Sequence, residues 1–241
     1  AQAAPVPAVP LGACQKPSHR YLRDVSIRPL RQSVRPSPVF LALVALTAAG
    51  GALAWTAAQS TGPAARIGVF VFVIGGWLVS LCLHEFGHAY SAWRFGDSDV
   101  EARGYLTLNP LKYSHPLLSL GLPLLFIALG GIGLPGGAVY LRTGFMTPRQ
   151  RTVVNLAGPF ANFVLAVVLL GATRLFFDHG HAVFWAGVAF LGFLQITALV
   201  LNLLPTPGLD VYAALEPHLK PSTQRALEPV NRWGFVILLV V

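Results

Sequence analysis

The chain has 241 residues, of which 54% are hydrophobic and only 11% are charged. This low charge and a mean hydropathy of +0.62 lie outside the range of soluble globular domains, which excludes an ordinary soluble enzyme. The formal net charge of +8 comes from basic residues in a tail and in loops. The sequence therefore predicts an integral, multi-pass membrane protein.

Residues 1–37 form a basic, proline-rich tail ahead of the first apolar stretch. The tail lacks the apolar core that a secretory signal peptide requires. A basic segment beside a first span is typical of a cytoplasmic topology signal that also contacts lipid headgroups, so we expect no nucleic acid as a partner. We expect a disordered tail over 1–37 and one membrane domain over 38–241.

Four apolar stretches are long enough to cross a bilayer, because a transmembrane helix needs about 20 residues. They are 39–58, 67–93, 153–177 and 183–204. A fifth stretch, 117–141, is interrupted by glycines and prolines, and we expect a re-entrant or β-hairpin segment there. The last run, 233–241, is too short to span, and we expect that the sequence is truncated there. The predicted fold class is all-α, with about four to six transmembrane helices.

The basic residues predict the orientation, because Lys and Arg accumulate in cytoplasmic loops. If 117–141 makes no net crossing, all basic residues except Arg66 and Arg174 fall on the same side as the tail. A full crossing would split the later basic clusters between the two sides. We therefore expect a cytoplasmic N-terminus and a location in a bacterial cell membrane.

The second apolar stretch ends in the motif His84-Glu85-Phe86-Gly87-His88. Histidines at positions i and i+4 share a helix face and bind zinc in the H-E-x-x-H arrangement, in which the glutamate is the general base. An ionisable residue inside a span is costly and marks a functional site. The alternative, that these are ordinary polar residues reaching for headgroups at a helix end, explains the position of Glu85 well inside an apolar stretch poorly.

A catalytic zinc site needs a third protein ligand and an open position for water. The candidates are the remaining carboxylates and His115, His179, His181 and His218. Asp210 is favoured, because the fourth stretch breaks at Pro205 and returns one carboxylate toward the membrane. A meeting of Asp210 with the motif requires the second and fourth stretches to end on the same side, as the charge placement also indicates.

These motifs resemble the site-2 protease family of intramembrane metalloproteases (M50-type). The segment 202–210 resembles that family's N-x-x-P-x-x-x-L-D-G motif, and 155–162 resembles its A-G-P-x-A-N helix start. The resemblance covers roughly 71–212, with three motifs in the right order. One departure is Val211, where the family has Gly. Because Val does not easily adopt a positive φ, we expect a different backbone after the ligand.

The resemblance implies a zinc metalloprotease that hydrolyses peptide bonds within or near transmembrane helices, as in regulated intramembrane proteolysis. One Zn²⁺ per chain, held by His84, His88 and Asp210, activates a water molecule whose proton Glu85 accepts. Further residues, Asn202 and Asn162, orient substrate or the metal ligands, or join helices through polar contacts. The predicted partners are a transmembrane protein substrate and the lipid bilayer.

Cleavage requires an extended substrate, and an exposed strand edge can hold one. The segments 101–108 and 138–142 are expected to be such edges or simply loops. Two other functions stay open. A metal transporter would need further ligands along the spans, which are otherwise almost free of carboxylates. A catalytically inactive family member would bind membrane helices, but it would have no need of Glu85 as a base.

Overall fold

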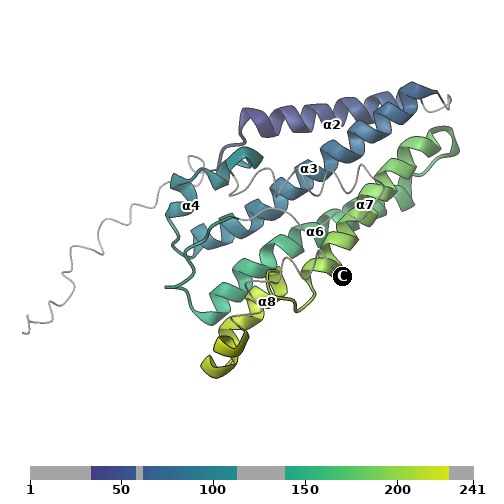
Figure 1. Ribbon diagram of the computed structural model, residues 1–241. Coiled ribbons are helices and arrows are strands. Elements are labelled where there is room, and N and C mark those ends of the chain that lie inside the picture. Colours follow the sequence, from purple (N-terminus) through teal and green to yellow (C-terminus); the bar gives the residue numbers. More distant parts are fainter. Residues whose placement is uncertain (1–33, 58–61, 113–138, 228–241) are drawn as a thin grey trace, which may run out of the picture.

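The computed structural model describes residues 34–57, 62–112 and 139–227, which form a bundle around four long helices (Figure 1). The helices are α2 (Pro38–Thr56), α3 (Pro63–Arg94), α6 (Pro148–Phe176) and α7 (Ala182–Asn202). Each is part of a segment long and apolar enough to cross a membrane, which confirms the four predicted spans. The described residues contain no strand, and the predicted all-α class is confirmed.

Proline and capping residues explain where two of the long helices begin. Ser37 caps α2 and accepts a hydrogen bond from the Phe40 N–H at 3.1 Å. Thr147 caps α6 in a capping box with Gln150. In both helices a proline follows the cap, because the first helical position needs no N–H donor and the φ of proline suits a helix. Helix α6 therefore begins a turn before its apolar stretch.

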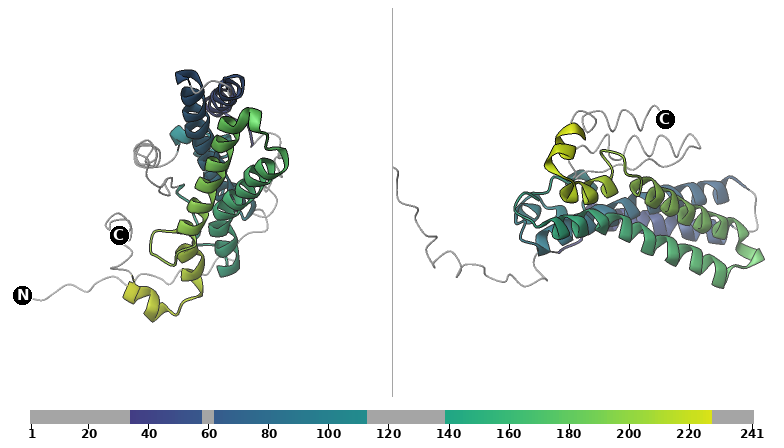
Figure 2. Two further views of the ribbon diagram at one scale, coloured as in Figure 1. Left: turned by 90° about the vertical axis from the view of Figure 1, so that its right-hand side faces the viewer. Right: turned by 90° about the horizontal axis from the view of Figure 1, so that it is seen from below.

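Helix α3 lies in the centre of the bundle, with α2 along one side and with α6 and α7 along the other (Figures 1 and 2). Glycines let α2 and α3 approach closely. A Cβ on Gly50 would lie 2.6 Å from the backbone nitrogen of Phe72, and one on Gly68 would lie 2.6 Å from that of Ala54. Small residues favour such backbone contacts in a bilayer, where apolar surface alone drives little association between helices.

The short helices that follow α3 and α7 gather at one end of the bundle (Figure 2). Those after α3 are α4 (Asp99–Ala102), η1 (Tyr105–Thr107) and η2 (Pro110–Lys112). Those after α7 are α8 (Asp210–Leu215) and η5 (Glu216–His218). At the opposite end, η4 (His179–His181) connects α6 to α7. The ends of the second and fourth spans are therefore on the same side, as the sequence requires for a shared site.

The chain leaves α3 and returns to α6 at this same end. The N–H of Arg142, ahead of α6, donates to Oδ2 of Asp97, just after α3, at 2.7 Å. The described residues on both sides of 113–138 thus lie together, as expected if that segment makes no net crossing. The predicted re-entrant or hairpin segment 117–141 falls mostly outside the described residues. The tail residues 1–33 and the run 233–241 also lie outside them.

The structure excludes one of the two possibilities left open for 101–108, the strand edge. The segment 101–108 forms no strand, since it contains the end of α4 and all of η1. Gly104 and Leu108 flank η1 with φ of 75° and 55°, and such left-handed residues turn the chain away from an extended path. Val211 lies inside α8 with a φ that is not positive, as expected for valine, and the different backbone expected relative to family members with Gly stays a prediction. Of 138–142, residues 139–142 are described and have neither helix nor strand.

Candidate metal centre

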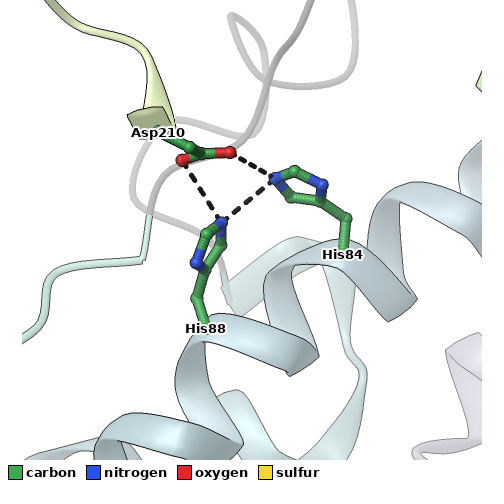
Figure 3. Close-up of side chains that lie close together, drawn as sticks. All are labelled: His84, His88 and Asp210. Atoms are coloured by element: carbon green, nitrogen blue, oxygen red, sulfur yellow. Dashed lines mark hydrogen bonds and ion pairs between the residues drawn. The ribbon is translucent and has the colours of Figure 1, made fainter. Parts of the chain in front are cut away.

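Side chains from α3 and from the first residue of α8 meet at the end of the bundle that carries the short helices (Figure 3). Oδ2 of Asp210 lies 3.2 Å from Nε2 of His84, and Oδ1 of Asp210 lies 3.3 Å from Nε2 of His88. The two Nε2 atoms are 3.1 Å apart. We call these three residues the ligand triad. The three side chains thus form a small triangle of donor atoms.

Helical spacing and a backbone carbonyl orient the two histidines. His84 and His88 are one turn apart on α3 and are 7% and 5% exposed. Nδ1 of His88 lies 2.7 Å from the carbonyl oxygen of Val154 on α6. The Nδ1–H therefore donates to that carbonyl, which leaves a lone pair on Nε2 facing the rest of the triad. Nδ1 of His84 is buried, with no hydrogen-bond partner among the described residues.

The packing of α8 on α6 positions Asp210. The side-chain amide of Asn155 donates to the carbonyl of Ala213 at 2.8 Å. The hydroxyl of Thr152 donates to the carbonyl of Ala214 at 2.9 Å. Both acceptors belong to α8 and both donors to the first turns of α6. These two bonds hold α8 against α6, so that Asp210, the third member of the triad, lies next to the histidines.

The backbone and the charges around Asp210 both suit a metal ligand. Gly208, in the turn between α7 and α8, has a φ of 95°, which glycine adopts without a steric penalty. Burial raises the pKa of Asp210, but His88 and His84 together lower it more, so the pKa lies below its ordinary value. Asp210 is therefore an ionised carboxylate, the form that binds a metal ion.

Two glycines bring α3 and α6 into contact beside the triad. A Cβ on Gly158 would overlap Nε2 of His88 and would lie 2.6 Å from Nε2 of His84. A Cβ on Gly87 would lie 2.7 Å from the carbonyl oxygen of Ala157. Any side chain at position 158 would thus occupy the space in front of the two nitrogen atoms. Glycine keeps that space free.

Glu85 is buried beside the triad, with only 3% of its surface exposed. The backbone of Val139 and all three triad residues lie close enough to its carboxylate to interact with it electrostatically. Glu85 is the only carboxylate in the four long helices. It does not belong to the group of converging donor atoms. Its position suits proton transfer better than ligation.

The triad has the donor atoms and the dimensions of a zinc site. In a tetrahedral site with bonds of about 2.0–2.1 Å, donor atoms lie about 3.4 Å apart. The corresponding separations here are 3.1, 3.2 and 3.3 Å. Donor atoms that converge so closely need a proton or a metal ion between them. Two imidazoles, one carboxylate and a side left free by Gly158 match a catalytic zinc site with three protein ligands.

Comparison with known proteins gives a consistent result. Residues 70–180 match the family described as Peptidase family M50. "Putative zinc metalloprotease Rip2" of Mycolicibacterium smegmatis is 71% identical over 217 residues, which cover 90% of this chain and 84% of the relative. The protein of the same name from Mycobacterium tuberculosis strain H37Rv is 71% identical over 211 residues, or 88% of this chain and 82% of that protein. The chain belongs to peptidase family M50.

A more distant M50 relative and the solved structures complete the comparison. "Putative zinc metalloprotease YwhC" of Bacillus subtilis is 33% identical over 172 residues, which cover 68% of this chain and 76% of that protein. No solved structure matches the chain. Membership of the M50 family confirms the resemblance to site-2 proteases and the predicted enzyme class, a zinc metalloprotease. The four apolar helices of this M50 protein suit a lipid bilayer.

The other candidate ligands of the M50 protein do not join the triad. His179 and His181 lie in η4 at the opposite end of the bundle. The His181 ring stacks on Trp55, with ring centroids 3.5 Å apart. Nε2 of His218 lies 2.8 Å from a hydroxyl of α6. His115 falls outside the described residues.

Two asparagines were predicted to support the site. Asn162 and Asn202 are both buried, with 4% and 5% of their surfaces exposed. Asn162 is one turn beyond Gly158 on α6, and Asn202 is the last residue of α7. In the part of the chain that the structure describes, neither amide forms a hydrogen bond with the triad. Their roles in binding substrate or supporting ligands stay predictions.

The sequence analysis did not identify a polar contact inside the bundle. Gln195, which is 1% exposed, donates from Nε2 to the hydroxyl of Ser80 at 2.9 Å and so connects α7 to α3. Ser80 is one turn before His84 on the same helix. The signal was present, since a polar amide inside an apolar span usually has a structural or functional partner. The sequence nevertheless contains nothing that pairs these two positions.

Proposed function

We propose that this protein is an intramembrane zinc metalloprotease that hydrolyses peptide bonds within or near transmembrane helices of membrane-protein substrates, in regulated intramembrane proteolysis. His84, His88 and Asp210 hold one Zn²⁺ per chain, and Glu85 is the general base. The observation that carries the proposal is the ligand triad with Glu85 beside it, on a helix long enough to cross a membrane.

The depth of the site supports a substrate inside the membrane. A helix rises about 1.5 Å per residue, so His84 and His88 lie about 15 Å and 9 Å from the end of α3 at Arg94. The 32 residues of α3 extend for about 48 Å, more than the hydrocarbon core of about 30 Å. The triad therefore lies toward one end of the span and not at its middle. Bonds near the end of a substrate helix are within its reach.

The residues around the triad have separate tasks in the proposed reaction. Zinc, when bound, supplies a Lewis acid that polarises the scissile carbonyl and favours ionisation of water. Glu85 accepts the proton of the attacking water and returns it to the leaving nitrogen. The Val154 carbonyl keeps Nε2 of His88 free for the metal. The backbone of Val139 holds the Glu85 carboxylate in place.

We also propose that residues 38–241 are the protease domain, that 1–37 are a cytoplasmic tail, and that the triad lies near the cytoplasmic face. The basic residues flanking α3 and α6 at the triad's end include Arg94, Arg103 and Arg149, whereas Arg66 and Arg174 lie at the opposite end. This asymmetry is typical of a cytoplasmic face. A bacterial cell membrane is the proposed location, since both relatives with 71% identity are bacterial.

A cleavage assay tests the function. The purified full chain, in lipid vesicles with a single-span substrate, should cleave that substrate, and Glu85→Gln should lower the rate about 10²- to 10⁴-fold while zinc content stays unchanged. Equal rates in the two proteins would rule out the proposed mechanism. Asp210→Ala tests the metal site separately, because loss of a ligand should remove zinc. An Asp210→Ala protein with full zinc content would exclude Asp210 from the site.

A further inference from the structure

A buried carboxylate outside the triad has no part in the proposed reaction. Asp97 follows α3 and is 1% exposed. Its Oδ1 accepts a hydrogen bond from the N–H of Asp99 at 3.1 Å, and its Oδ2 accepts one from the N–H of Arg142 at 2.7 Å. A buried charge is costly unless such bonds compensate it. The bond to Arg142 connects segments 45 positions apart.

The segment that Asp97 holds also contacts the catalytic region. The segment 139–142 begins at Val139, whose backbone lies close enough to the Glu85 carboxylate to interact with it, and ends at Arg142, whose N–H bonds to Asp97. The segment is packed as well as hydrogen-bonded. Val139 and Leu141 pack against the apolar cluster at the end of α3, whereas Tyr140 between them is 56% exposed. Such alternation is typical of an extended chain with one face on the core.

The two ends of this segment are close enough to be coupled. Three residues of extended chain span at most about 10 Å. A shift of the Arg142 backbone is therefore transmitted to Val139, with only two residues between them to absorb it. The Arg142 side chain, on the exposed side of the segment, restrains the chain less than the backbone bond to Asp97 does. The Arg142 guanidinium, which pairs with Asp99 at 2.7 Å, is 71% exposed, and such surface pairs contribute little.

We propose that Asp97 is a positioning residue for Glu85: it holds the backbone of Arg142, and the extended segment 139–142 then presents the Val139 N–H to the Glu85 carboxylate. The inference rests on the proposed function, because it gives Glu85 the role of the base. Asp97 is not a member of the triad, and its two hydrogen bonds come from the backbone N–H groups of Asp99 and Arg142. Its loss should therefore slow the reaction without removing the metal.

Kinetics on the purified full chain test this role. In Asp97→Asn, one acceptor oxygen becomes an NH₂ group that faces a backbone N–H. We expect kcat per zinc-loaded molecule to fall about tenfold, with KM and zinc content unchanged. Asp99→Asn is the matched control, since it removes the exposed ion pair but leaves both bonds to Asp97, and its kcat should stay within about twofold of the unaltered protein.

Hydrogen exchange tests the positioning directly and does not depend on cleavage. In the unaltered protein the amides of Val139 and Arg142 should exchange slowly. In Asp97→Asn both should exchange faster, while α3 is unaffected. If Asp97→Asn does not fold, Arg142→Pro removes the same N–H donor, and Arg142→Ala is its control for the lost guanidinium.

The outcomes separate this inference from the proposed function. An unaltered kcat in Asp97→Asn, or a loss no larger than in Asp99→Asn, would overturn the inference. Fast exchange at Val139 in the unaltered protein, or equal exchange there in Arg142→Pro and Arg142→Ala, would also overturn it. A protein that cleaves nothing, yet loses Val139 protection in Asp97→Asn, would refute the protease function and support the restraint by Asp97.

Discussion

Gly158 of α6 lies so close to His88 of α3 that a Cβ at position 158 would overlap the Nε2 atom of the histidine. The same Cβ would lie 2.6 Å from Nε2 of His84. Both nitrogens are rigidly placed, because His84 and His88 are buried on one helix and the Val154 carbonyl holds His88. The glycine therefore sets how closely α6 approaches the triad.

Gly158→Ala should abolish or severely weaken zinc binding, because the added methyl group would occupy the space in front of Nε2 of His84 and His88 that the metal needs. Gly171→Ala on the same helix is the control, since nothing lies within 4 Å of its Cβ position. That control should keep its zinc and gain up to about 1 kcal/mol of helix stability. Metal analysis of both purified variants checks this. Full zinc occupancy in Gly158→Ala would contradict the role of the glycine.

Asn155→Leu should weaken zinc binding about tenfold, because the lost amide no longer holds the Ala213 carbonyl and α8 shifts with Asp210. Zinc affinity is measured by competition with a chelator of known affinity. Thr197→Val is the control, since among the described residues its exposed hydroxyl donates only to the Phe193 carbonyl of its own helix. Equal affinities in the two variants would show that the α6–α8 contact does not position the ligand.

The contact between Ser80 and Gln195 should respond unequally to its two single mutations. Ser80→Ala leaves the buried Gln195 amide without its partner and should cost about 1–2 kcal/mol in unfolding free energy. Gln195→Leu should cost less, because the Ser80 hydroxyl still donates to the Trp77 carbonyl at 2.8 Å. Unfolding of both variants and of the double variant in detergent measures these costs. Additive costs would indicate that the two side chains do not interact.

Stability should depend on pH through Asp178, at the end of the bundle opposite the triad. The Trp185 indole N–H and then His181 lower the pKa of Asp178 below its ordinary value of 3.8. The ionised form therefore stabilises the fold above about pH 4, and this contribution disappears as the pH falls through the lowered pKa. Asp178→Asn should lower the unfolding temperature at about pH 7, with a difference that shrinks as the pH falls below about 4. A difference that is constant with pH would contradict this.

Removal of zinc should destabilise the end of the bundle that carries α8, because α8 then loses the connection that the metal makes from Asp210 to the two histidines of α3. Zinc at about 100 times its dissociation constant should stabilise the fold by about 2.7 kcal/mol. Thermal unfolding with a chelator, and again after zinc is restored, measures the effect. Asp210→Ala should show little response to zinc. An equal response in that variant would show that the stabilising zinc binds elsewhere.

The sequence by itself determined the spans and the centre of the site. Four apolar stretches became α2, α3, α6 and α7, because a bilayer requires about 20 apolar residues from a helix. His84 and His88 were predictable as a pair, since a spacing of four places two side chains on one helix face. Asp210 was predictable because prolines break the chain after α7 and a catalytic zinc needs a third ligand.

Only the tertiary structure decided what supports these residues. The bond from His88 to Val154 joins positions 66 apart, and the bond from Arg142 to Asp97 joins positions 45 apart. Hydrophobic periodicity and motif spacing describe neighbours along one element, so they contain no information on which backbone carbonyl or amide meets a side chain across the bundle. The strand edge considered as one possibility for 101–108 does not form for a related reason, since the left-handed turns at Gly104 and Leu108 belong to a loop packed at the end of α3.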